Sequence, residues 1–292
     1  MANLRDIRDR IASVKNTQQI TKAMKMVAAA RLKKAQDRVV ATRPYAASIA
    51  KVIGKLASEA SSENPYLRTA EQQDKILLII VSSDRGLCGG FNTNLFRFIE
   101  DQIKTNFSQQ QENGTLELVC IGRKSFDHFR KRGYNVKRSH VGFFDKLQFD
   151  SAAAVMRTAT QEFLNSEHDA VYLAFNEFKS VITQNRVMTQ LLPLDVSYQD
   201  DTGDDNTNYI YEPSAKAILE SIIPLHLNTQ IWKATLESNA SEHGARMAAM
   251  DNATENASEI MRQLKLKYNQ ARQAAITTEI SEIVSGAEAL SN

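Results

Sequence analysis

Apolar residues recur at helical spacing near the N-terminus. The first stripe has the 3,4,3 spacing of a coiled-coil seam and consists of Leu4, Ile7, Ile11 and Val14. After a polar break at 17–19, apolar residues resume one position out of step, at Ile20, Met24 and Val27. This pattern predicts a helix whose apolar stripe packs against a partner.

The C-terminal end carries two stripes of the same kind. One consists of Met250, Ala253, Ala257, Ile260 and Leu264, and the other of Ile276, Ile280, Ile283, Ala287 and Leu290. Glycine and proline, which destabilise helix interiors, are rare at both ends of the chain. Residues 1–60 contain only Pro44 and Gly54, and 225–285 contain only Gly244. The two ends are therefore predicted to be long helices that pair as an antiparallel coiled coil, with the longer helix projecting beyond its partner.

Two prolines are predicted to interrupt these helices. Pro44 marks a kink or a break in the first helix, and Pro224 separates a short helix at 215–223 from the final one.

The middle of the chain alternates between strand and helix patterns. Strands are predicted at KILLIIV, LELVCIG, YNVKRSHV, AVYLAFNEF and VMTQLLPLD, with helices at about 94–105, 124–132 and 151–165. This alternation predicts a three-layer, Rossmann-like α/β domain with a mainly parallel sheet. The predicted organisation is thus an N-terminal coiled-coil helix at 1–60, a linker at 61–74, an α/β domain at 75–196, a linker at 197–208 and a C-terminal coiled-coil helix at 209–292.

Composition and charge narrow the class of protein. The 292 residues are 42% hydrophobic and 24% charged with a net charge of +2, which is ordinary for a folded protein. The apolar run Ile76–Val81 is far shorter than the roughly 20 residues needed to span a bilayer. The N-terminus lacks the apolar core of a signal peptide, and Asp6 and Asp9 disfavour a transit peptide, so we expect a cytoplasmic protein.

The stretch SSDRGLCGGFN, residues 82–92, follows a predicted strand, where many enzymes bind phosphate. A P-loop needs GxxxxGK[ST], but the segment that begins at Gly86 has neither the lysine nor the correctly placed hydroxyl. A dinucleotide site needs GxGxxG and an acidic residue after the second strand, but the glycines stand at 86, 89 and 90 and that strand ends in Gly122 and Arg123. We expect these glycines to supply positive φ angles in a tight turn that binds no cofactor.

No catalytic or metal-binding set is apparent. Asp84 and Arg85 lack partners at a recognisable spacing, and His128, His140 and His168 are scattered. Cys88 and Cys120 lie far apart, without a metal-ligand spacing, and are expected to be semi-buried and free. The acidic stretch at 200–208 is expected to be a solvated loop.

Several segments together resemble one known family. IASVKNTQQITKAMKMVAAARLKKAQ (11–36) and YNQARQAAITTEISEIVSGAEAL (268–290) resemble the first and last helices of the γ subunit of bacterial F-type ATP synthase. SSDRGLCGGFN and YIYEP are similar to the central motifs of that family. The resemblance extends over essentially the whole chain.

The resemblance implies a non-catalytic rotor shaft. In that family the shaft couples ion flow through the membrane c-ring to ATP synthesis or hydrolysis in the catalytic β subunits. The implied partners are the α3β3 hexamer, ε and the c-ring, at the cytoplasmic face of the bacterial inner membrane, with membrane association only through the complex. The implied β-subunit contacts are Lys22, Met24, Lys25, Arg31, Lys33, Lys34, Arg272, Gln273 and Thr277. The implied c-ring or ε contacts are Tyr209, Tyr211 and Glu212. The family's plant chloroplast members carry an inserted cysteine pair, which has no counterpart here, so thiol switching is not expected.

Two other functions are compatible with parts of the sequence. One is a nucleotide-binding α/β enzyme with helical oligomerisation arms, which the incomplete phosphate-binding motifs disfavour. The other is a nucleic-acid adaptor, because residues 1–60 contain 13 Lys and Arg but only four acidic residues. That segment lacks interleaved aromatic residues, and its apolar seam is committed to pairing, so no nucleic-acid partner is expected.

Overall fold

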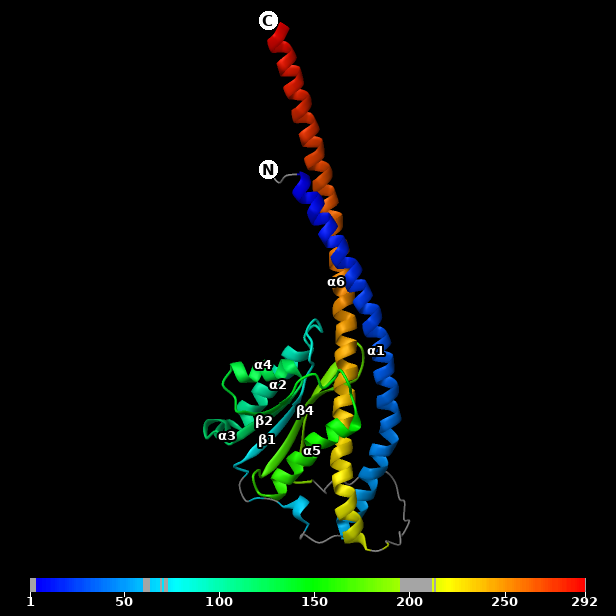
Figure 1. Ribbon diagram of the computed structural model, residues 1–292, viewed down its shortest axis with the longest axis vertical. Helices are drawn as coiled ribbons and strands as arrows, with labels where there is room; N and C mark the ends of the chain where they lie inside the picture. The colour runs from blue at the N-terminus through cyan, green and yellow to red at the C-terminus, as the bar shows by residue number, and fades with distance from the viewer. Residues whose placement is uncertain are drawn as a thin grey trace. The chain divides into compact units, whose positions relative to one another are not determined.

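The computed structural model describes residues 4–59, 64–68, 70, 73–194, 212 and 214–291. The chain divides into two compact units. One consists of Met1–Ala28 with Met247–Asn292, and the other of Ala29–Arg246. The two long helices, α1 (Leu4–Glu59) and α6 (Ala215–Ser291), contribute to both units (Figure 1).

The first unit is an antiparallel pair of helices. As residue numbers increase along α1, the contacting residue numbers on α6 decrease. Arg8 Nη2 donates to the Tyr268 hydroxyl at 3.0 Å, the hydroxyls of Thr21 and Thr254 lie 2.8 Å apart, and Lys25 forms an ion pair with Asp251. These three pairs keep one register and confirm the predicted antiparallel pairing in this unit.

The seam of α1 follows an unbroken heptad pattern rather than the predicted offset. Leu4, Ile7, Ile11 and Val14 are half-buried as expected, but Ile20 and Val27 are 60% and 53% exposed. The buried Thr21 takes the seam position instead, because its hydroxyl is satisfied by Thr254 and by the Gln18 carbonyl. A polar residue thus occupies a seam position that an apolar-only pattern skips.

The seam of α6 also differs from the prediction in one place and ends before the helix does. Met250, Ala257 and Leu264 are buried, whereas Ile260 is 46% exposed and the neighbouring Met261 is half-buried. From Arg272 to Ala287 every residue is exposed, including Ile276, Ile280 and Ile283. Within this unit, α6 therefore extends past the residues that pair with α1.

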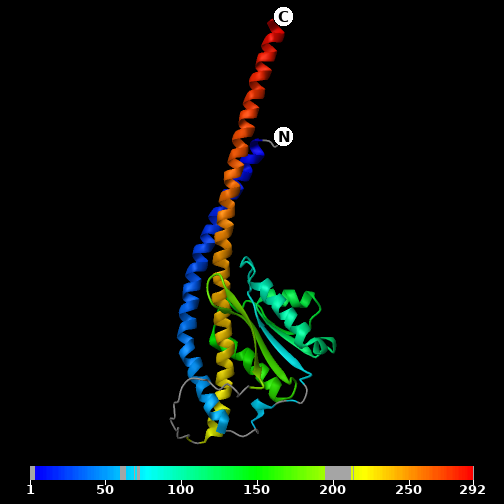
Figure 2. The same cartoon turned by 180° about the vertical axis from the view of Figure 1, so that it is seen from behind.

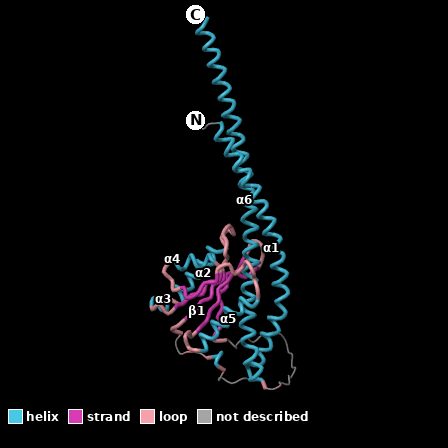
Figure 3. The backbone as a smooth tube through the Cα atoms, viewed as in Figure 1, coloured by secondary structure: helices cyan, strands magenta, loops and turns pink. Residues whose placement is uncertain are grey.

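The second unit contains a five-stranded sheet of order β3-β2-β1-β4-β5, drawn in magenta in Figure 3. The strands are β1 (Ile76–Val81), β2 (Leu116–Ile121), β3 (Val136–His140), β4 (Ala170–Phe178) and β5 (Gln184–Leu192). β1 to β4 are parallel, and β5 pairs antiparallel with β4. This order and the crossover helices confirm the predicted Rossmann-like class.

Helices cover both faces of the sheet (Figures 1 and 2). On one face α2 (Phe91–Asn106), the short α3 (Ser108–Glu112) and α4 (Arg123–Lys131) accompany a core that contains Ile76, Leu78 and Ile80 of β1. On the other face α5 (Phe149–Leu164) and parts of α1 and α6 pack on the alternate residues of β1, Leu77, Ile79 and Val81. β1 is buried on both faces, as expected for the central strand of a three-layer domain.

Neither proline ends a helix. Pro44 lies inside α1 and Pro224 inside α6, so the predicted separate helix at 215–223 is wrong. A proline in a helix interior costs about 3 kcal/mol relative to alanine. Burial of Leu219, Ile223 and Leu227 on both sides of Pro224 offsets that cost. A short 3₁₀ helix (Pro65–Leu67) lies between α1 and β1.

Gly122, directly after β2, shows where only glycine fits. Its φ is +98°, and an added Cβ would lie 2.4 Å from the Ser82 carbonyl oxygen after β1. The ends of β1 and β2 can therefore approach each other closely only with glycine at this position. Among the residues that the structure describes, no helix is long and apolar enough to cross a membrane.

Gly244, in the interior of α6, provides a first test of the packing. An added Cβ would meet the Phe178 ring and the Val181 backbone at 3.5 Å, which is ordinary contact. Because alanine is a better helix former, Gly244→Ala should raise the free energy of unfolding by about 0.5–1 kcal/mol in denaturant titrations. Gly114→Ala is the control and should lower it by about 1–2 kcal/mol, because Gly114 has a φ of +72°. Destabilisation by Gly244→Ala would contradict this packing.

Candidate functional site

The glycine-rich turn lies where parallel α/β sheets usually bind ligands. It joins β1 to α2 and begins at the carboxyl end of β1. β1 and β4 are neighbours at the point where the strand order reverses, and ligands of doubly wound sheets bind outside the strand ends at that point. The position therefore has the topology of a nucleotide site.

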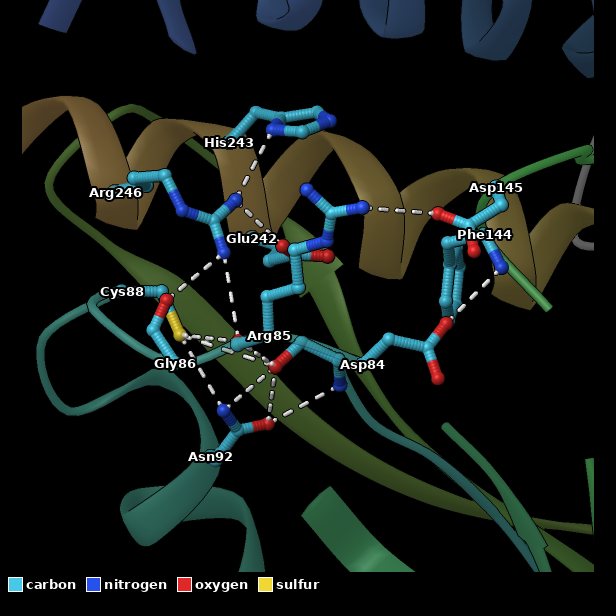
Figure 4. Close-up of polar contacts among 11 residues, drawn as sticks. Asp84, Arg85, Gly86, Cys88, Asn92, Phe144, Asp145, Glu242, His243 and Arg246 are labelled. Carbon is cyan, nitrogen blue, oxygen red and sulfur yellow. Dashed lines mark hydrogen bonds and ion pairs between the residues drawn. The ribbon is translucent and has the colours of Figure 1, made fainter. Parts of the chain in front are cut away.

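Helix α6 occupies this position (Figure 4). The Ser238 hydroxyl donates to the carbonyl of Val81, the last residue of β1, at 3.4 Å. Arg246 Nη2 donates to the carbonyls of Gly86 at 3.2 Å and Arg85 at 3.4 Å, and its guanidinium also pairs with the buried Glu242. The carbonyls of the turn point at a cation of the same chain, so the turn binds a helix here.

The polar side chains of the motif bond within the chain. Asp84 accepts hydrogen bonds from the amides of Arg123 at 3.0 Å, Gly142 at 2.8 Å and Phe144 at 3.2 Å. A carboxylate that accepts three amides ties the β1 turn to the start of α4 and to the loop after β3. It is therefore committed to holding loops together, and a catalytic role for Asp84 has no support.

Ser83 and Asn92 close the turn from inside. The Ser83 amide donates to Asn92 Oδ1 at 3.1 Å, Asn92 Nδ2 donates to the Ser83 hydroxyl at 2.7 Å, and that hydroxyl donates to the Arg85 carbonyl at 2.7 Å. Ser83 and Asn92 are buried, so their polar side chains need these bonds to avoid being unsatisfied.

The backbone of the turn only partly follows the prediction. Gly89 has a positive φ of 56°, as expected, but Gly90 has φ −81° and caps α2. The second positive φ, 63°, belongs to Leu87, whose side chain is 67% exposed. The assignment of positive φ to all three glycines was therefore wrong, because one of the sharp bends falls on leucine.

The cysteines and histidines form no reactive set in the described part of the chain. Both cysteines are buried and free, and burial raises the pKa of Cys88 and raises that of Cys120 to about 12. His128 bonds to Glu100 at 2.8 Å, and His168 is buried beside Lys137. The described residues contain no group of three or more ligands that could hold a metal ion.

The residues predicted to contact β lie on both long helices. On α1, Lys22, Arg31, Lys33 and Lys34 are exposed, whereas Met24 is half-buried and Lys25 pairs with Asp251. On α6, Arg272, Gln273 and Thr277 are exposed, beyond the last seam residue. Glu212 is exposed, and Tyr209 and Tyr211 lie outside the described residues.

Comparison with known proteins identifies the family. The family model described as ATP synthase matches residues 3–290. The ATP synthase gamma chain of Chlorobaculum parvum is 49% identical over 292 residues, covering 99% of each chain, and that of Chlorobium limicola is 46% identical over the full length of both. The chain belongs to the ATP synthase gamma chain family.

Solved structures share this gamma chain fold. The central stalk and c-ring structure of Tetrahymena thermophila mitochondrial ATP synthase includes a chain that is 26% identical, with a TM-score of 0.61, covering 80% of this chain and 99% of that one. A chain of the Euglena gracilis mitochondrial ATP synthase is 21% identical, with a TM-score of 0.69. The match covers 98% of this chain and 94% of that one, and it shows the shared fold.

Sequence reasoning about the gamma chain missed the α6 side of this site. Glu237, Glu242 and Arg246 stand in ESNASEHGAR, residues 237–246, for which the sequence pattern predicts only a helix. The signal for this polar contact was the lack of large apolar residues over 237–246 inside a predicted coiled-coil helix. A helix segment that is polar all round yet buried must meet polar groups.

Asp84→Ala should lower the free energy of unfolding by about 2–4 kcal/mol, because it leaves three backbone amides without their acceptor. The exposed Asp101 on α2 gives the matched control, and Asp101→Ala should change stability by less than about 0.5 kcal/mol. Equal effects of the two substitutions in urea titrations would contradict the bracing role of Asp84.

His243 on α6 predicts a pH dependence. Burial, with Arg246 and Arg31 nearby, lowers its pKa to about 4 from an unfolded value near 6.5. The folded chain therefore binds this proton more weakly, and the stability contributed by the neutral ring is lost as the pH falls from about 6.5 to 4. His243→Gln should reduce the loss over that range by roughly 3 kcal/mol. Parallel stability–pH curves for the parent and the variant would contradict this.

Proposed function

We infer that this chain is the central rotor shaft of F-type ATP synthase. The observation that carries the inference is the full-length match to ATP synthase gamma chains at up to 49% identity. The chain is a non-catalytic subunit, and the complex is the enzyme. It couples ion flow through the c-ring to ATP synthesis or hydrolysis at the β subunits by rotating.

The unpaired end of α6 supports insertion into a surrounding assembly. Ile276, Ile280, Ile283 and Val284 are 48–66% exposed and have no partner on α1. Contiguous exposed apolar surface marks a contact with another protein. No Lys or Arg follows Arg272, so this tip avoids strong ion pairs with acidic loops around it. We assign the α3β3 hexamer as the partner of this stripe.

Exposed basic positions on α1 and polar positions on α6 supply electrostatic and polar contacts. Lys22, Arg31, Lys33 and Lys34 present cations that suit acidic loops of β, and Arg272, Gln273 and Thr277 offer polar contacts on α6. Lys25 contributes less, because Asp251 already neutralises its ammonium group. Met24 is half-buried and offers an edge of apolar surface.

Rotation requires that one chain meets three equivalent β subunits differently. A pair of helices of unequal length has no three-fold symmetry, so each β subunit meets a different face and favours a different conformation. Coupling between shaft angle and nucleotide affinity is reciprocal, so hydrolysis turns the shaft and turning the shaft releases ATP.

The segment at 209–212, which precedes α6, is assigned to the membrane side of the complex. Glu212 is exposed, and we assign it with Tyr209 and Tyr211 to contacts with the c-ring or ε. Aromatic residues are favoured as interface anchors. The chain is part of a membrane-associated complex, and we place it at the cytoplasmic face of the bacterial inner membrane.

Truncation of α6 tests this function. A chain that ends at Asn269 keeps the Arg8–Tyr268 contact but loses the exposed apolar stripe. In vesicles that carry the reconstituted complex, the truncated chain should lose most ATP-driven ion pumping, whereas a control that lacks only residues 291–292 should retain it. The function would be refuted if the full-length chain neither joined α and β nor changed their ATP turnover.

A further inference from the structure

Glu237 is a buried carboxylate that the proposed contacts with other subunits do not use. It lies on α6 and is 1% exposed. Oε2 accepts a hydrogen bond from the amide of Phe178, the last residue of β4, at 3.1 Å, and Oε1 lies 3.5 Å from Arg43 Nη2 on α1. A buried carboxylate is unfavourable unless it is paired and hydrogen-bonded, so this one side chain holds three elements together.

Gly244 lies on the same side of α6 as Glu237, because seven residues are close to two helical turns. Its Cα faces the hairpin between β4 and β5, where an added Cβ would meet the Phe178 ring and the Val181 backbone at 3.5 Å. Glu237 and Gly244 therefore form one contact side of α6, against the end of β4.

Ser238 and Arg246 lie roughly a third to a half of a turn further round the axis of α6, at about 100° per residue. They contact the Val81, Arg85 and Gly86 carbonyls after β1, as Figure 4 shows for Arg246. α6 is thus held on two sides by neighbouring parallel strands. Turning α6 about its axis in either sense displaces Glu237 from the Phe178 amide and Arg246 from the turn carbonyls.

We propose that this two-sided grip, formed by Glu237 and Gly244 on one side and by Ser238 and Arg246 on the other, transmits torque between the sheet and α6. Glu237 is the positioning residue of the β4 side. The proposal rests on the rotor function proposed above. A contact on one side alone would let α6 pivot about that contact, whereas contacts on two sides of the helix together oppose its rotation against the sheet.

The test measures the torsional stiffness of the grip in the assembled protein. A bead is attached to the sheet through Lys131→Cys at the end of α4, because the native thiols of Cys88 and Cys120 are buried. The α3β3 hexamer is immobilised, and the angular variance of the bead is recorded while the motor pauses for ATP. Because the linkage through the sheet carries the bead, a looser grip widens this variance.

Glu237→Ala removes the acceptor of Phe178 and the partner of Arg43, and should raise the angular variance about twofold or more while ATP turnover stays near that of the parent. Glu237→Gln keeps an oxygen for the Phe178 amide and should recover most of the stiffness. Glu220→Ala, an exposed glutamate on α6, is the matched control and should leave the variance unchanged.

Gly244→Leu is a second probe that retains every polar side chain but wedges the hairpin away from α6. It decides the question if Glu237→Ala does not assemble, and it too should widen the variance. Unchanged variance in Glu237→Ala or, failing its assembly, in Gly244→Leu would overturn the grip. If the bead on the parent chain did not rotate at all, the rotor function itself would fail, which is a different result from rotation with an unchanged variance.

Discussion

The structure depends on one replacement: helix α6 lies at the strand ends where a doubly wound sheet would otherwise bind a ligand. Ser238 bonds to the end of β1, Glu237 to the end of β4, and Arg246 to the carbonyls of the glycine-rich turn. A phosphate site would need amides that point outward and a nearby free cation. Here the cation comes from α6 and is bound by carbonyls, so the sheet holds a helix.

The coiled-coil unit follows a second constraint, the need to fix register without forming a uniformly apolar seam. Thr21 pairs with Thr254, and Lys25 with Asp251, at or beside seam positions of α1 and α6. Polar pairs inside a seam specify alignment at some cost in stability. They also leave Ile20, Met26 and Val27 of α1 exposed, which supplies apolar surface for partners next to the basic positions.

Much of the fold could be predicted because long helices and a buried central strand have strong periodic signals. β1 was predicted closely because ILLIIV is apolar at every position, and the sheet class followed from the alternation of strands and helices. The helix break predicted at Pro224 is absent because burial of the neighbouring apolar residues against the sheet outweighs the cost of proline in a helix. The local sequence does not reveal that burial. The seam position of Thr21 was not predicted, because its partner Thr254 lies more than 200 residues away in the sequence.

The site was less predictable than the fold. The glycine spacing of SSDRGLCGGFN shows that it is not a phosphate-binding motif. The spacing does not show that the turn contacts Arg246, because Arg246 is 160 residues from Gly86. Glu237 and Glu242 gave only the weak signal of polar residues in a helix predicted to be buried. Long-range polar contacts of this kind depend on the three-dimensional arrangement of strand ends, which the periodicity of each segment does not determine.

The most direct measurement is amide hydrogen exchange across residues 81–94 in the isolated chain, with and without Mg-ATP. If α6 occupies the strand ends, exchange in the turn is slow without nucleotide and stays the same at every ATP concentration. A saturable, ATP-dependent slowing of exchange in 81–94 would contradict the account, because it would show that the turn binds nucleotide in place of the helix.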